Sequence, residues 1–199
     1  METKARAILI GLILGDGYLT KPFGSSTKSM LDIKYHEKSL EYLQWMHKEL
    51  QELQLSEIKK KKGASQYRFY TKTRDDIGRL HEIFYPGGVK HIPKGITKYL
   101  KDPLTLAVWY QDDGKLDFRS KYHSNSLFAT YCFPYDECEL LANALRVNFD
   151  LDVRVCKCQM RGKMYYSLYV TSKSMDLFMQ IIEPHIQKCF YYKLVKYRK

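Results

Sequence analysis

Two apolar stretches of this 199-residue chain end in the same way, with an aspartate followed by a glycine. The first spans residues 9–17 (LIGLILGDG) and the second spans residues 106–114 (LAVWYQDDG). A glycine directly after an apolar helical run commonly ends a helix, so each stretch predicts a helix with an acid at its C-terminal end. The helix dipole makes that end unfavourable for a carboxylate. Two such acids, Asp16 and Asp113, therefore predict a bound cation between two helices packed side by side.

The order of the expected elements repeats once along the chain. The first half predicts a helix, two strands, a helix, a hairpin and a helix at residues 4–15, 18–23, 29–36, 40–53, 58–72 and 75–84. The second half predicts the same order at residues 104–113, 115–121, 127–133, 135–149, 153–170 and 174–182. This weak internal repeat predicts an α+β fold of two pseudo-symmetric αββαββα halves with antiparallel sheets, residues 1–98 and 99–199.

The composition favours a polyanionic partner. Lysine and arginine number 33 against 22 aspartates and glutamates, giving a net charge of +11, and the chain has 17 tyrosines. This excess is typical of nucleic-acid-binding proteins, although a ribosomal or membrane-surface protein would share it. We expect no membrane span and see no targeting segment, because no apolar run approaches about 20 residues. The five cysteines lack Cys-x-x-Cys spacing, which argues against a disulfide framework or a zinc site.

The two stretches also resemble the LAGLIDADG motif of homing endonucleases. Matching letters in the first stretch are Leu9, Gly11, Leu12, Ile13, Asp16 and Gly17, and in the second they are Leu106, Ala107, Asp113 and Gly114. In that family, chains with one motif are homodimers and chains with two motifs are monomers with two pseudo-symmetric halves. The chain resembles the second kind. The resemblance implies a monomer whose sheets form a DNA-binding saddle around a central pair of motif helices.

The resemblance further implies metal-assisted hydrolysis of double-stranded DNA, with Asp16 and Asp113 as metal ligands. Magnesium, or another divalent cation such as manganese, suits this role because it needs few protein carboxylates. The backbone carbonyls of Gly15 and Asp112 are further candidate ligands. The Asp112 side chain is interpreted equally well as a surface acid at a helix end.

Family members also place a lysine near each metal, where it orders water or polarises the phosphate. By position these lysines are Lys90 and Lys193, which follow the two motif acids at similar distances along the chain. The alternative for each is a solvated lysine in a basic protein.

Antiparallel strands can lie in the DNA major groove and read base edges with alternate side chains. The candidates for such contacts in the first half are Lys34, Lys60, Lys62, Arg68, Tyr70 and Lys72. Those in the second half are Lys115, Asp117, Arg119, Lys121, Arg154, Lys157 and Lys163. Any one of them could instead be an ordinary solvated strand residue. The lysine run 59–62 predicts a backbone clamp, because four adjacent side chains point to both faces.

Three functions remain open. The first is a site-specific DNA endonuclease, the second is a maturase of the same fold that binds intron RNA, and the third is a structural nucleic-acid-binding protein. The two acids favour the enzyme, since RNA binding alone does not need paired carboxylates. A glycosidase also uses two carboxylates, but the basic excess would have no role in it. We expect a protein encoded in an organelle or found in a prokaryotic cytoplasm.

Overall fold

The structure, a computed structural model, describes residues 1–118, 124–160 and 162–197. The chain forms two compact units, Met1–Lys90 and His91–Lys199. Among the helices of the described residues, none has the length and apolar character needed to cross a membrane. Each unit is described separately below.

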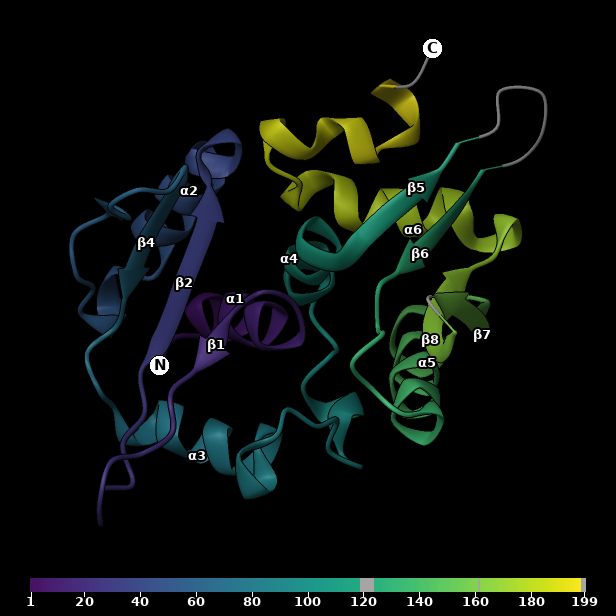
Figure 1. The fold of residues 1–199 in the computed structure, drawn as a ribbon. Coiled ribbons are helices and arrows are strands. Elements are labelled where there is room, and N and C mark those ends of the chain that lie inside the picture. Colours follow the sequence, from purple (N-terminus) through teal and green to yellow (C-terminus); the bar gives the residue numbers. More distant parts are fainter. Residues whose placement is uncertain (119–123, 161, 198–199) are drawn as a thin grey trace. The chain divides into compact units, whose positions relative to one another are not determined.

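The first unit contains one four-stranded antiparallel sheet and three α-helices (Figure 1). Its elements are α1 (Thr3–Leu14), β1 (Tyr18–Leu19), β2 (Leu31–His36), α2 (Leu40–Glu49), β3 (Lys59–Lys60), β4 (Gln66–Tyr70) and α3 (Asp75–Phe84). The strand order is β1-β2-β4-β3. Helix α2 packs against β2 and β4, where its buried Tyr42, Leu43 and Met46 join the core.

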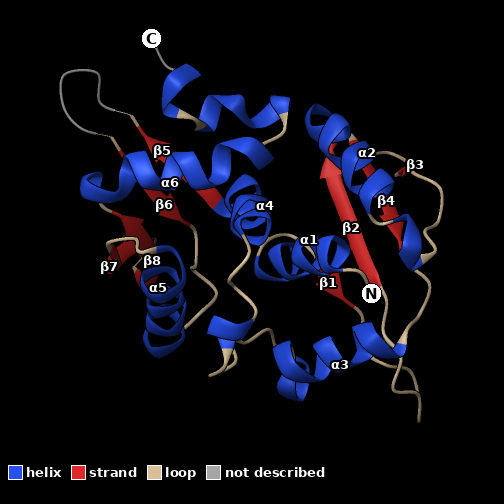
Figure 2. Cartoon of the chain, turned by 180° about the vertical axis from the view of Figure 1, so that it is seen from behind, coloured by secondary structure: helices blue, strands red, loops and turns tan. Residues whose placement is uncertain are grey.

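The second unit repeats this arrangement, with its helices and strands in the same order as in the first (Figure 2). Its elements are α4 (Pro103–Asp113), β5 (Gly114–Asp117), β6 (Asn125–Phe128), α5 (Tyr135–Phe149), β7 (Val153–Met160), β8 (Lys163–Val170) and α6 (Met175–Ile182). The strand order, β5-β6-β8-β7, corresponds to that of the first unit. The predicted α+β fold of two αββαββα units with antiparallel sheets is therefore confirmed. The saddle and the central pair of motif helices stay predictions.

Several strands are shorter than the sequence pattern predicts. The strand expected over 18–23 is limited to Tyr18–Leu19, and Pro22 lacks the N–H group that a longer ladder would need. The strand expected over 127–133 ends at Phe128, because Thr130 N–H donates to the Phe128 carbonyl and closes a turn. The expected hairpin strand over 58–62 is limited to Lys59–Lys60.

The large side chains of the second motif fill the core of their own unit. Trp109 and Tyr110 are fully buried. The Trp109 ring lies 4.2 Å from that of Phe128, and the Tyr110 ring lies 5.5 Å from Phe128 and 5.0 Å from Phe178. These aromatic contacts attach α4 to β6 and α6, and so they fix the helix end that carries Asp113.

Candidate active site

Both motif acids lie at the C-terminal end of an apolar helix, as predicted. Helix α1 ends at Leu14, so Asp16 lies in the turn that follows and is exposed. Helix α4 continues to Asp113 itself, which is half-buried. The two acids thus occupy related but unequal positions, one beyond its helix and one on the last helical residue.

The glycine after each acid is required by close packing. An added Cβ on Gly17 would lie 2.8 Å from the Leu12 carbonyl oxygen, and one on Gly114 would lie 2.3 Å from that of Tyr110. Neither glycine has positive φ; Gly114 is extended, at φ −78°. Each helix ends before its glycine, as predicted, but without the left-handed conformation that a glycine at a helix end often adopts. The motif needs glycine because the chain turns back against the helix that it has just left.

Replacing Gly114 by alanine is expected to destabilise the fold. The added Cβ would also lie 2.0 Å from Cδ2 of the buried Tyr110 ring, so the ring or the backbone must shift. Overpacking of this kind typically costs about 1–3 kcal/mol. Equilibrium chemical unfolding measures the loss. Gly95→Ala is the matched control, because no atom lies within 4 Å of an added Cβ there and its φ is −89°. Equal stability of the two variants would contradict the prediction.

Lys90 lies against the end of the first motif helix. Its Nζ donates to the Gly15 carbonyl at 2.7 Å and to the Leu14 carbonyl at 3.3 Å. The last carbonyls of a helix lack intrahelical partners and carry the negative end of its dipole. The ammonium group therefore stabilises the helix end and lies beside the residue that precedes Asp16.

Lys193 makes the corresponding contact in the second unit. Its Nζ donates to the Gln111 carbonyl at 2.6 Å and to the Tyr110 carbonyl at 3.3 Å. It is 7% exposed and lies 5.1 Å from the centre of the Phe190 ring. The alternative of a solvated lysine is thus wrong for Lys193. Both lysines come from the C-terminal end of their units, and both bind the end of a motif helix.

A cavity of about 380 Å³ opens beside the Lys193 contact. Its lining residues are Gly114, Lys115, Leu116, Tyr192 and Lys193. Since a water molecule occupies about 30 Å³ in the liquid, the cavity has room for a phosphodiester group and several waters. The buried ammonium group of Lys193 is therefore next to a space that a charged substrate can enter.

The donor groups fit a hard divalent cation better than a zinc-type site. Among residues 1–118, 124–160 and 162–197, no group of three or more histidine, cysteine, aspartate or glutamate side chains could hold a metal. Magnesium takes one or two carboxylates and completes its shell with water and phosphate oxygens, so one motif acid per unit suits it. The Gly15 carbonyl, a predicted ligand, already accepts from Lys90, so a metal there would lie close to an ammonium group.

The predicted nucleic-acid contacts of the first unit fall on more than one surface. Lys34 pairs directly with Arg68 across β2 and β4, and Tyr70 follows two residues later on the same face. We call this surface, with Asp32 included, the open face of the first sheet. Lys59 pairs with Arg68 and Lys60 pairs with Tyr67, so these two lysines alternate between the faces of the sheet, as the interpretation of the lysine run expects. Of the other two predicted contacts, Lys62 lies in the turn after β3 and Lys72 is exposed beyond β4.

The second sheet gives a similar result. Counting alternate residues along the register places Lys115, Asp117, Arg154 and Lys163 on one face. Lys157 pairs with Tyr166 and lies on the other face, because it is three positions after Arg154 and side chains alternate between the two faces of a strand. The predicted contacts Arg119 and Lys121 lie outside the described residues.

Asp32 is a candidate functional residue that the sequence analysis missed. Its carboxylate accepts from Arg68 Nε at 2.6 Å and from Arg68 Nη2 at 2.9 Å. This fork raises the pKa of Arg68. The alternation of β2 places Asp32 on the polar face, but its pairing with Arg68 depends on the register of β2 and β4, which the sequence does not show.

Residues 6–178 match the model of the LAGLIDADG DNA endonuclease family. The chain belongs to this family. The chain is 29% identical to the cytochrome b mRNA maturase bI2 of Saccharomyces cerevisiae over 96% of its own length and 47% of the maturase. It is 31% identical to the intron-encoded endonuclease ai4 of Dictyostelium discoideum over 67% of its length and 79% of that protein.

A solved structure of the same family supports the fold. The homing endonuclease I-WcaI bound to its DNA recognition sequence aligns with 98% of this chain and 87% of its own, with a TM-score of 0.79 and 22% identity. At this identity the likeness shows the fold, and the roles of individual residues rest on the geometry above. The chain spans about half the length of the Saccharomyces maturase.

Proposed function

We propose that this family member is a site-specific endonuclease that hydrolyses both strands of a long DNA target. The observation that carries the proposal is the repeated helix end, where in each unit a lysine ammonium group binds carbonyls at the end of the helix that leads to a motif acid. Intron-encoded and homing endonucleases among its relatives support the same activity. The positive charge of +11 supplies the attraction to a polyanion.

Each residue has a role in the proposed reaction. Asp16 and Asp113 would hold magnesium or manganese, with the Gly15 and Asp112 carbonyls as further candidate ligands, and the ion would stabilise the charge that develops on the phosphate. Lys90 and Lys193 hold their ammonium groups at the helix ends, where they orient water or polarise a phosphate oxygen. The open face of the first sheet and the face of the second sheet that carries Lys115, Arg154 and Lys163 contact the DNA, through phosphates for affinity and through base edges for specificity.

A cleavage assay on a randomised duplex library with magnesium tests the proposal. We expect a small set of sequences to be cut on both strands, and we expect a single chain to act on one duplex. The salt dependence of DNA binding provides an internal check, because each neutralised phosphate contributes about −0.9 to the slope of the logarithm of the binding constant against the logarithm of the salt concentration. The absence of any enriched cut site, together with a slope near zero, would contradict the proposal.

A maturase is the second candidate, because a relative that matches almost the whole chain is a cytochrome b mRNA maturase. Tight binding of a structured intron RNA by a chain that cuts no duplex would favour this function. The endonuclease remains the better proposal, since both acids and both lysines are present at the helix ends.

A further inference from the structure

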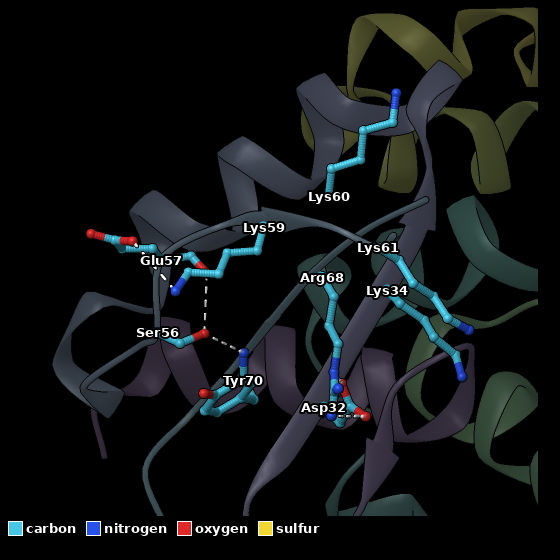
Figure 3. A pocket seen from close by; sticks show the side chains of 9 residues that line it. All are labelled: Asp32, Lys34, Ser56, Glu57, Lys59, Lys60, Lys61, Arg68 and Tyr70. Carbon is cyan, nitrogen blue, oxygen red and sulfur yellow. Dashed lines mark hydrogen bonds and ion pairs between the residues drawn. The ribbon is translucent and has the colours of Figure 1, made fainter. Parts of the chain in front are cut away.

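The open face of the first sheet has a cavity of about 330 Å³ whose base is formed by the Arg68–Asp32 pair (Figure 3). Lys34, Lys59 and Lys61 also line it. The Asp32 side chain is 16% exposed and that of Arg68 is 46% exposed, so the carboxylate lies deep and the guanidinium faces solvent. The pair is thus a charged fork on a surface that also carries several lysines.

The fork determines which part of the guanidinium remains available. Asp32 takes the Nε hydrogen and one Nη2 hydrogen, which are two of five donors. Both Nη1 hydrogens and the second Nη2 hydrogen, at the outer end of the plane, have no acceptor among the described residues. Such an outer edge presents two parallel N–H groups, the arrangement that matches O6 and N7 of guanine.

Two contacts keep this edge in one orientation. The Arg68 Cζ lies 5.5 Å from the centre of the Tyr70 ring, which supports the guanidinium plane by a cation–π contact. Tyr70 is itself anchored to Ser56, since the Tyr70 N–H donates to Ser56 Oγ at 3.1 Å and the Ser56 N–H donates to the Tyr70 carbonyl at 2.8 Å. An arginine held in this way loses little further side-chain entropy on binding.

The negative charge of Asp32 also makes Arg68 better suited to contact a base than a phosphate. The carboxylate largely offsets the positive charge of Arg68, which weakens its attraction to phosphate but leaves its outer N–H donors intact. Lys34 pairs with Arg68 in the register, has no carboxylate partner in the part of the chain that the structure describes, and is suited to phosphate. Lys60 extends away from the Arg68–Asp32 pair in Figure 3 and bonds Glu37 instead.

We propose that Arg68 is the residue that reads one guanine in the target half contacted by the first unit, and that Asp32 positions it for this contact. The inference rests on the proposed DNA-binding function and adds a specificity to it. Lys34 and Lys61 then hold the neighbouring phosphates, and Arg68 discriminates between base pairs at one position.

The test begins with duplexes selected by wild-type binding from a randomised library in calcium. Each conserved guanine is replaced by 7-deazaguanine, which lacks N7 but keeps O6. At one guanine we expect roughly a tenfold loss of wild-type affinity. At the same base pair the wild type should discriminate against the other bases roughly ten- to hundredfold. The Arg68→Gln variant should lose this discrimination, and 7-deazaguanine should no longer lower its affinity.

The Asp32→Asn variant tests whether Asp32 positions Arg68 for the base contact or only stabilises the fold. It removes a negative charge, so we expect affinity for non-specific DNA to hold or rise while discrimination at the same pair falls. Arg74→Gln is the matched control, because Arg74 forms an equivalent fork with Asp76 at 2.9 and 2.8 Å, away from the open face. This control should keep the wild-type base preference. Melting curves of all three variants show whether each is folded.

The outcomes distinguish this inference from the function on which it rests. If Arg68→Gln weakens binding to every sequence equally and lowers the salt slope by about one, Arg68 is a phosphate contact and the inference is wrong. If 7-deazaguanine affects wild type and Arg68→Gln alike, another residue reads the guanine. If the wild-type chain enriches no duplex at all, the proposed function fails together with the inference.

Discussion

Replacing Asp16 or Asp113 by asparagine is expected to abolish cleavage of both strands and to leave DNA binding intact. Each carboxylate lies at the C-terminal end of a helix, where the dipole disfavours a negative charge that no cation compensates. Asparagine keeps the size and removes the charge, so the ion that the carboxylate should hold would be lost. Removing one such electrostatic contribution typically lowers the rate at least about a hundredfold. Single-turnover cleavage with magnesium and gel shifts with calcium measure the two properties separately.

The matched control for these variants is Asp150→Asn. Asp150 also follows a helix C-terminus, α5, but at φ 55°, a left-handed conformation that asparagine tolerates well. It should cut at the wild-type rate. Because each unit carries its own acid, a single Asn variant is expected to nick one strand in preference to the other. Wild-type rates for both motif variants would contradict the proposed mechanism.

Replacing Lys193 by methionine is expected to lower both the cleavage rate and the stability of the second unit. The Gln111 and Tyr110 carbonyls would lose a buried donor, which costs about 1–3 kcal/mol. The loss of the ammonium group beside the cavity should slow cleavage by roughly a hundredfold. Single-turnover rates and duplex affinities are measured where the variant is folded, and unfolding curves measure its stability, so the two effects are separated.

Lys90→Met provides the comparison within the same chain. Lys90 makes the same type of contact but is half-buried, so we expect a similar loss of rate with a smaller loss of stability. Affinity for the duplex should change by no more than a few fold in either variant. A loss of affinity with an unchanged rate would remove both lysines from the proposed catalytic groups. Lys101→Met, a change at an exposed lysine, controls for the loss of one positive charge.

Much of the fold could be predicted because local patterns are strong in this chain. The 3.6-residue period over 135–149 predicts the bounds of α5, and Leu31, Ile33 and Tyr35 alternate along the buried side of β2. Strand ends were less predictable. Hydrogen bonds between distant segments decide where a ladder stops, and the residues at the ends carry little signal of their own.

The sequence by itself determined the repeated αββαββα order, the basic charge and the placement of Asp16 and Asp113 at helix ends, because each depends on residues close together along the chain. The tertiary structure alone decided three other features. It brought Lys90 and Lys193 to carbonyls more than 70 residues away, it showed that Gly17 and Gly114 are needed for close packing, and it paired Asp32 with Arg68. These features depend on strand register and on contacts between distant segments, which no local pattern encodes.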